Sequence, residues 1–169
     1  MENALTGIII IGVMILAILG LSEGALSAQA NLAEASRAMQ ERLTNQARTE
    51  LQVLQASTVL GGNAVDVTVK NTGTTKLADF AHWDVVLDYT SITGSRVSWY
   101  AYNSSWTQQI YISTATSTFE KLEPNILNPG EEMIIHVIVG IAVNAGSTNA
   151  AIVSTPNGIA VSTTFSGPP

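Results

Sequence analysis

The sequence predicts an α+β protein in which a long N-terminal hydrophobic and amphipathic α-helix is followed by an immunoglobulin-like antiparallel β-sandwich. Apolar residues keep helical spacing from about residue 3 to about residue 57, and no proline interrupts them. From residue 63 onward, short runs of alternating apolar and polar residues are separated by turn sequences, which is typical of strands. We therefore divide the chain into a helix at residues 1–60 and a β-sandwich at residues 61–169.

The first part of the helix, residues 3–22, carries no charge. About 20 apolar residues, rising 1.5 Å each, match the roughly 30 Å hydrocarbon core of a bilayer. A secretory leader has a basic start, whereas the only charge before this run is Glu2. The nearest basic residue, Arg37, follows the run and would favour a cytoplasmic C-terminal part, although the rest of the sequence is typical of an exported domain. We therefore hypothesise that a basic pre-peptide has been removed and that Met1 begins the processed chain.

The second part of the helix, residues 23–58, is amphipathic. Its larger apolar residues, together with Ala47, recur at steps of three, four, six or seven residues, and this spacing indicates one helical face. Gly20 and Gly24 have the small-xxx-small spacing that lets neighbouring helices approach closely. We expect the helix to stop at Gly61-Gly62, after a length of about 80 Å. The predicted stripe consists of Leu26, Leu32, Met39, Leu43, Leu51 and Leu54.

A helix of this length needs partners. A domain of about 100 residues has a radius of gyration near 13 Å, so most of the apolar helix would face water unless other copies cover it. A coiled-coil dimer is one solution, and lateral packing of many copies is another. Identical copies related by a rotation and a rise that does not close form an open helical filament. The predicted core of such a filament consists of Leu5, Ile8, Ile9, Ile11, Val13, Met14, Ile15, Leu16, Ile18, Leu19 and Leu21.

The remainder of the chain contains about seven predicted strands. Residues 65–69 alternate valine with polar residues, and a turn sequence follows at residues 71–74. The apolar run at residues 133–140 predicts a central, buried strand. Thr155-Pro156-Asn157-Gly158 predicts a hairpin near the C-terminus. Seven short strands joined by short turns are expected of an immunoglobulin-like sandwich.

The sequence contains no recognisable catalytic or metal-binding motif. It has no cysteine, which excludes thiolate nucleophiles and cysteine-based metal sites. HExxH, GxSxG and GxxxxGK[ST] sequences are also absent. We interpret His136, which lies in an apolar strand, as a structural histidine rather than a metal ligand. The net charge of −6 argues against binding to nucleic acid. We expect a protein that is not an enzyme and uses no metal or other cofactor.

One modification site is a candidate from the sequence. Asn103-Ser104-Ser105 is the single Asn-x-Ser/Thr triplet, and it opens a polar loop after an aromatic strand. Glycosylation of Asn103 requires an exported domain.

The order of these features resembles that of the archaellins, the filament subunits of the archaeal motility structure, which are similar to type IV pilins at the N-terminus. The resemblance is carried by the glycine-punctuated apolar helix, by VDVTVKNTGTTKL at residues 65–77, by LNPGEEM at residues 127–133, and by STPNGIAVSTTF at residues 154–165. Many type IV pilins have glutamate at the fifth mature position, where this chain has Leu5.

The resemblance implies how such a chain is made and assembled. A prepilin-type peptidase removes a short basic leader, and the helix then leaves the membrane to join a homo-oligomeric helical filament. The β-domain forms an outer sheath that is often glycosylated. A cytoplasmic ATPase and its membrane platform drive assembly and rotation, so the subunit itself has no catalytic duty.

We therefore expect a structural subunit that self-assembles into an archaellum filament for swimming. It would be inserted in the membrane before assembly and extracellular afterwards. Two alternatives stay open: a non-motile adhesive type IV pilin, and a membrane-anchored accessory or stator protein that binds the cell-surface layer. The long helical stripe favours the filament, because a stator needs only the membrane span.

Overall fold

The computed structural model describes the backbone of residues 2–169 and the side chains of residues 7–169. The predictions made for Met1 and for the side chain of Leu5 lie outside the described residues. The chain forms two compact units, Met1–Leu43 and Thr44–Pro169, and each is described here by itself.

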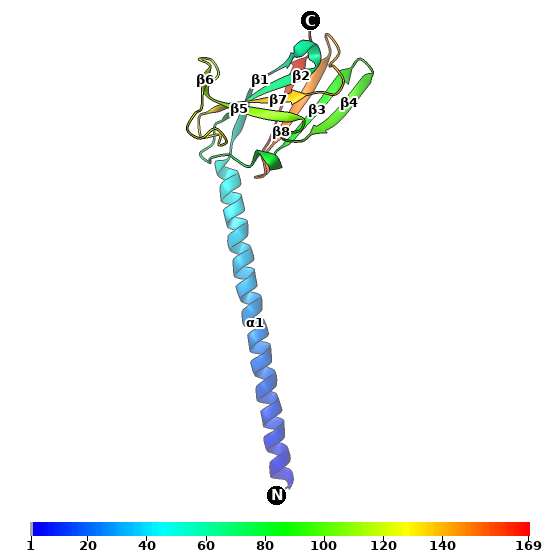
Figure 1. Ribbon diagram of the computed structural model, residues 1–169. Coiled ribbons are helices and arrows are strands. Elements are labelled where there is room, and N and C mark those ends of the chain that lie inside the picture. Colours follow the sequence, from blue (N-terminus) through cyan, green and yellow to red (C-terminus); the bar gives the residue numbers. More distant parts are fainter. Residues whose placement is uncertain (1) are drawn as a thin grey trace. The chain divides into compact units, whose positions relative to one another are not determined.

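The first element is a single α-helix, α1 (Glu2–Arg48, 47 residues), which is drawn in blue and cyan in Figure 1. The absence of proline and the abundance of alanine, leucine, glutamate and glutamine favour an uninterrupted helix. The hydroxyl of Ser22 donates to the carbonyl oxygen of Ile18 (2.8 Å), so this polar side chain is satisfied within the apolar part of the helix.

The predicted helix is ten residues too long, because α1 ends at Arg48 and residues Leu51–Val59 form strand β1. Strand β1 pairs with β2 (Ala64–Asn71) and contains a bulge between Val53 and Gln55. The bulge places one extra residue, Leu54, in the strand. Leucines three positions apart, at 51 and 54, therefore imitate helical spacing although both lie in a strand. Pairing with β2 outweighs the local preference for helix.

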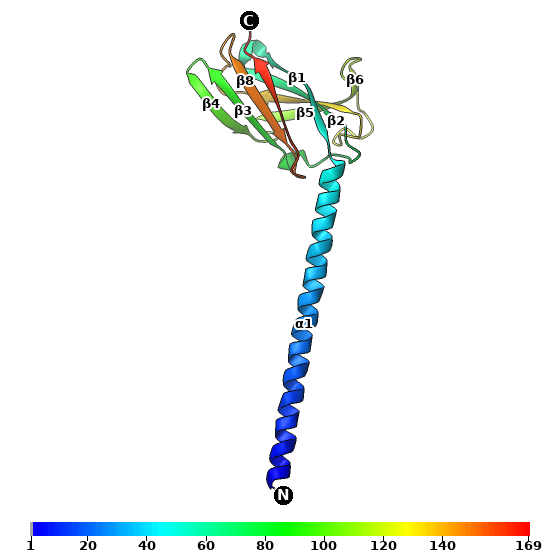
Figure 2. The ribbon, with the colours of Figure 1, turned by 180° about the vertical axis from the view of Figure 1, so that it is seen from behind.

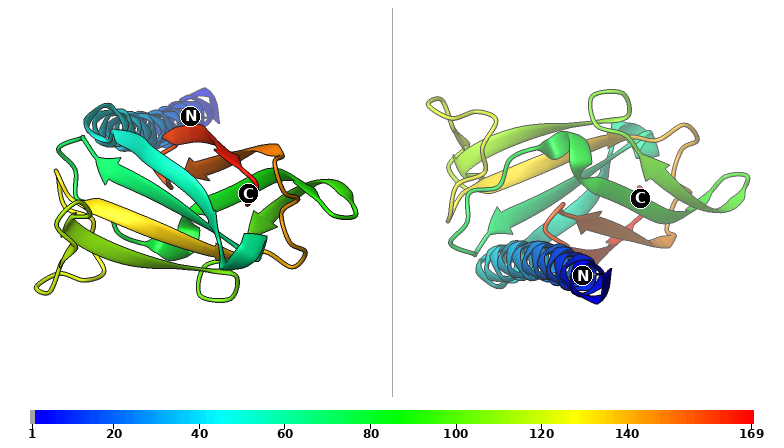
Figure 3. Two further views of the ribbon diagram at one scale, coloured as in Figure 1. Left: turned by 90° about the horizontal axis from the view of Figure 1, so that it is seen from above. Right: turned by 90° about the horizontal axis from the view of Figure 1, so that it is seen from below.

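Nine strands in the described chain form two antiparallel sheets, which confirms the predicted α+β class with a sandwich-like β-part (Figure 3). The sheet orders are β1-β2-β7-β5-β6 and β4-β3-β8-β9. The remaining strands are β3 (Asp84–Ser91), β4 (Gly94–Tyr100), β5 (Trp106–Ser113), β6 (Thr118–Phe119), β7 (Glu132–Ile138), β8 (Thr148–Ser154) and β9 (Ala160–Ser166). Figure 2 shows β9, in red, beside β1, and the Thr58 hydroxyl donates to the Ser166 carbonyl at 3.3 Å.

The hydrophobic core lies between the two sheets. Alternate residues of the central strands point into it, and Val65, Val67 and Val69 of β2 are completely buried. Trp83 and Trp106 are each 1% exposed and fill the end of the core near Phe80, with the rings of Phe80 and Trp83 5.3 Å apart. The predicted central strand is β7, whose inward residues are also fully buried.

The predicted hairpin near the C-terminus is confirmed, and the prediction for Gly61-Gly62 is corrected. Residues 155–158 join β8 to β9, with Gly158 at a φ of +81° and its N–H donating to the Thr155 carbonyl (2.9 Å). Gly61 and Gly62, expected to end the helix, instead form the turn between β1 and β2, where both have positive φ angles.

Candidate self-assembly surface

The apolar head of α1 is uncovered. Its described large side chains are between 53% and 75% exposed, on every side of the helix. These residues are Ile8, Ile9, Ile10, Ile11, Val13, Met14, Ile15, Leu16, Ile18, Leu19 and Leu21. Burying each such side chain contributes about 2 kcal/mol, so the helix has a strong tendency to enter an apolar environment. Within the described residues, this one helix is long and apolar enough to span a bilayer.

The structure adds Ile10 to the predicted set and leaves space beside the glycines. Ile10 is 53% exposed within the same apolar run. A Cβ atom added to Gly12, Gly20 or Gly24 would meet no atom within 4 Å. These glycines are therefore open positions at which another helix can approach the backbone closely.

The amphipathic part of α1 carries a narrower stripe than predicted. At about 100° per residue, Leu32, Met39 and Leu43 lie on one face, whereas Leu26 is displaced by roughly 120°. All four side chains are more than half exposed. Leu51 and Leu54 do not belong to this stripe, because both lie in β1: Leu51 is buried in the sandwich core and Leu54 is 42% exposed at the bulge.

The last turn of α1 belongs to the same compact unit as the strands, and the turn at residues 71–74 holds it. The N–H of Thr74 donates to the carbonyl of Arg48 (2.9 Å), and the N–H of Gly73 donates to the carbonyl of Glu50 (3.1 Å). A Cβ on Gly73 would lie 2.5 Å from the carbonyl oxygen of Arg48. Only glycine permits this close approach of the two backbones. The carbonyl of Arg48, which has no N–H partner within the helix, accepts instead from the N–H of Thr74 in the turn.

A second turn contacts the same region. The side-chain amide of Asn157 donates to the hydroxyl of Thr49 (3.1 Å), and this hydroxyl donates to the carbonyl of Asn45 (2.7 Å). Two turns that the sequence places about 80 residues apart therefore hold the end of α1, and both occur in the stretches that resemble archaellins.

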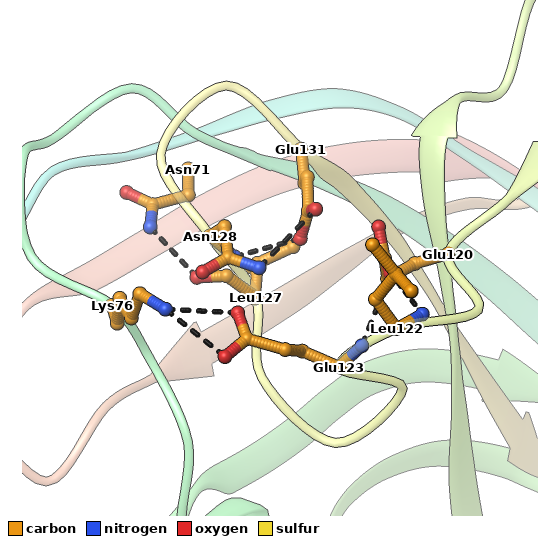
Figure 4. Close-up of polar contacts among 8 residues, drawn as sticks. All are labelled: Asn71, Lys76, Glu120, Leu122, Glu123, Leu127, Asn128 and Glu131. Carbon is orange, nitrogen blue, oxygen red and sulfur yellow. Dashed lines mark hydrogen bonds and ion pairs between the residues drawn. The ribbon is translucent and has the colours of Figure 1, made fainter.

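Asn71 connects these stretches to a third, the turn at residues 127–131 (Figure 4). Asn71 is fully buried, and its side-chain amide donates to the carbonyls of Leu127 (3.0 Å) and Thr75 (2.8 Å). Its side-chain oxygen accepts from the N–H of Gly73 (3.1 Å). Gly130 donates its N–H to the carbonyl of Asn71 at 2.7 Å. One side chain thus organises both turns.

Carboxylates of the neighbouring loop stabilise its backbone, as Figure 4 shows. Glu123 pairs with Lys76 (2.8 Å), and this partner lowers the pKa of the Glu123 carboxyl. Glu120 accepts from the N–H groups of Glu123 and Leu122, and these hydrogen bonds lower the pKa of Glu120. Glu131 accepts from the N–H of Asn128 (2.8 Å). These hydrogen bonds and the ion pair therefore stabilise the structure of the loop.

Glu132 is the most buried carboxylate in the described β-domain, with 8% of the residue exposed. It accepts from the N–H and the hydroxyl of Thr114, at 2.8 and 2.5 Å, and pairs with Lys70 (3.4 Å). The hydrogen bonds from Thr114 are the main cause of the lowered pKa of Glu132, with a smaller contribution from Lys70.

The two histidines and Asn103 lie apart from this network. His136 is on the central strand β7 and pairs with Asp66 (2.5 Å), and His82 pairs with Asp79 (2.8 Å). No group of three or more potential metal-ligating His, Cys, Asp or Glu residues occurs among the residues described. Asn103 is exposed in a tight turn with a φ of +58°.

Solved structures with a similar fold come from archaeal flagella and their stator proteins. A chain of the archaeal flagellum of Methanospirillum hungatei strain JF1 matches with a TM-score of 0.62 and 17% identity, over 96% of this chain and 92% of that chain. The chain therefore shares its fold with this flagellum chain. Because the unit Thr44–Pro169 makes up only about three quarters of the residues, the match includes much of the helix as well as the sandwich.

Two further structures with a related fold come from Sulfolobus acidocaldarius. The archaellum periplasmic stator protein FlaG matches with a TM-score of 0.52 and 24% identity, over 69% of this chain and 99% of that chain. A chain of the periplasmic stator complex of FlaF and FlaG matches with the same TM-score and identity, over 69% of this chain and 89% of that chain. At these identities the likeness establishes the fold. No protein-family model and no curated protein matches the sequence.

Proposed function

We propose that this chain is the structural subunit of an archaellum filament that supports swimming. The observation that carries the proposal is the 47-residue helix α1, whose described large apolar side chains are more than half exposed. The archaeal-flagellum fold, shared over 96% of the chain, supports the same function.

Assembly follows from the chemistry of the helix. Lipid tails are about as apolar as leucine, so the head of α1 can exchange lipid for neighbouring helices at little hydrophobic cost. Gly20 and Gly24 then allow close packing between copies. Repetition of one rotation and rise produces an open helical polymer rather than a closed ring. The division proposed from the sequence is kept, with the boundary moved to the end of α1: the helix forms the core and the sandwich forms the outer layer.

The remaining roles belong to the same proposal. The subunit has no catalytic duty and no cofactor. A prepilin-type peptidase would process its N-terminus, and an assembly ATPase with its membrane platform would build the filament outside the cell. Asn103 is the proposed glycan acceptor, because its side chain is exposed in a turn.

The stator alternative rests on the FlaG likeness, which spans 69% of this chain. The unit Thr44–Pro169 makes up about three quarters of the chain, so the sandwich unit by itself is large enough to account for this match. The second part of α1 favours the filament, because residues 23–43 extend beyond a membrane span and still expose Leu32, Met39 and Leu43.

Deletion and re-expression of the gene test the proposal. Negative-stain microscopy of shed surface fibres, with mass identification of their subunit, should find this chain in the fibre, and its loss should abolish both fibres and swimming. Fibres that contain the chain on cells that adhere but never swim would favour an adhesive pilin. Normal fibres made of another subunit, with loss of rotation, would favour a stator.

A further inference from the structure

A polar hollow lies on the outer face of the five-stranded sheet, where β2, β7 and β5 run side by side. Its volume is about 420 Å³, which is within the usual range for small-molecule sites. The side chains that define it are Asp66, Thr107, Gln109, Tyr111, Ile134 and His136. None of these residues takes part in the proposed filament core.

One row of the hollow consists of Asp66, His136 and Thr107, which occupy paired positions on the three strands. The Asp66 carboxylate and the His136 Nδ1 atom are 2.5 Å apart. A carboxylate is an acceptor, so Nδ1 carries the hydrogen and Nε2 is the ring nitrogen left for a ligand. Both side chains are partly exposed, 29% for Asp66 and 36% for His136. The pair is thus held in place and open to a ligand.

The next row contains Ile134 and Gln109, again at paired positions. The hydroxyl of Tyr111 donates to the side-chain oxygen of Gln109 (2.9 Å), which orients the amide. The amide nitrogen of Gln109 therefore remains as a donor, and Ile134 supplies an apolar contact between the polar groups.

The composition of the lining excludes several ligand classes. No lysine or arginine lines the hollow, so an anion has no counter-charge there. The Tyr111 ring packs on Phe119, with centroids 4.6 Å apart, and is not a free platform for a nucleobase. Strand β7, which carries Ile134 and His136, is paired with β2 on one side and β5 on the other, so it offers no open edge to a peptide. An uncharged ligand rich in hydroxyl groups fits the remaining mixture of donors, acceptors and one apolar side chain.

We propose that this hollow binds a neutral sugar ring. Asp66 accepts from one sugar hydroxyl, Nε2 of His136 hydrogen-bonds to another, Gln109 donates to one, and Thr107 can do either, while Ile134 contacts the ring carbons. This site is independent of filament formation, and either proposal can fail without the other.

The test uses the full-length chain, made without glycan and held in a zwitterionic detergent that has no sugar headgroup. Saturation-transfer difference NMR would be recorded with D-glucose, D-galactose, D-mannose and N-acetyl-D-glucosamine. We expect saturable binding of at least one sugar, weakened about tenfold by Asp66→Asn, which replaces a charged acceptor oxygen with a donor, and by Gln109→Ala, which removes the amide donor. Asp88→Asn, an exposed carboxylate on the other sheet, is the matched control and should leave binding unchanged.

Thermal unfolding of each variant separates lost binding from lost folding. If no sugar saturates the protein up to about 50 mM, or if both folded variants bind like the unmodified chain, the proposal is wrong.

Two sources of sugar are distinguished in assembled fibres. Equal binding of added sugar by unmodified and Asn103→Gln fibres assigns the site to sugars from the surroundings. Binding only by the Asn103→Gln fibres indicates that glycan from neighbouring copies already fills the hollow. Absence of binding by both kinds of fibre overturns the proposal.

Discussion

The side-chain amide of Asn71 donates to the carbonyl of Leu127 at 3.0 Å and joins two turns that are 56 residues apart in the chain. Through Gly73, the same turn contacts the end of α1. One buried side chain therefore connects the turns at residues 71–74 and 127–131, and the first of these turns contacts the last turn of the helix.

Replacing Asn71 tests this arrangement. Asn71→Ala removes three hydrogen bonds of the side chain and leaves the N–H of Leu77 as the donor to the buried carbonyl of Leu127. We expect a loss of about 3 kcal/mol in the free energy of unfolding, measured by denaturant titration of the full-length chain in detergent. Asn125→Ala, at an exposed loop position, should cost much less. Equal effects of the two substitutions would contradict the organising role of Asn71.

The contact between Gly73 and the helix end makes a second prediction. In Gly73→Ala, the new Cβ would lie 2.5 Å from backbone atoms of Arg48 and Glu50, which cannot move away as a side chain can. The substitution should lower the stability of the domain by about 2 kcal/mol or more. Gly140→Ala introduces a Cβ into open space and serves as the control in the same unfolding experiment. An unchanged melting temperature for Gly73→Ala would show that the turn does not hold the helix end.

The Glu132 network predicts a dependence of stability on pH. Because the folded state lowers the pKa of Glu132, its contribution is fully present above the ordinary value of 4.5 and is lost as the pH falls through the lower folded pKa. Glu132→Gln should therefore weaken the loss of stability on acidification, measured as the midpoint of denaturant unfolding across this range. Glu50→Gln, at an exposed position, is the control. A pH profile unchanged by Glu132→Gln would argue against this coupling.

Charges placed in the apolar head should abolish assembly. Ile11→Asp and Leu16→Arg each introduce a charge into the proposed filament core, where an unpaired charge costs several kcal/mol. We expect no fibres by negative-stain microscopy, although the chain is still made. Leu122→Arg is the matched control, because Leu122 is 92% exposed on a loop of the sandwich unit. Fibres of normal appearance from either core variant would contradict the core assignment.

The fold class could be predicted because its two periodicities are simple. Val65, Val67 and Val69 alternate in the sequence and are all fully buried in the structure. The end of the helix could not be placed, because the bulge in β1 spaces Leu51 and Leu54 as a helix would. A local sequence pattern cannot distinguish a bulged strand from one more helical turn when the deciding contact is the distant strand β2.

The candidate site was predictable only in part. The apolar head was evident from composition. The orientation of an alternating strand was not, because alternation does not show which face is buried. Val97 and Trp99 share a face of β4, and this face is the outer one, where Val97 is 71% and Trp99 59% exposed. The Asn71 turn was recognised as a turn, but its bond to Leu127 depends on three-dimensional proximity. His136 and Asp66 meet for the same reason, across two strands whose register no local pattern reveals.

The central claim is that the natural environment of α1 is other copies of α1. Helical reconstruction by cryo-electron microscopy of fibres from cells that express this chain tests it most directly. We predict a map in which the helices form the fibre core and residues 8–21 of each copy contact only neighbouring copies. Recovery of the chain solely as a lipid-bound monomer, at every concentration and without any fibre on those cells, would contradict it.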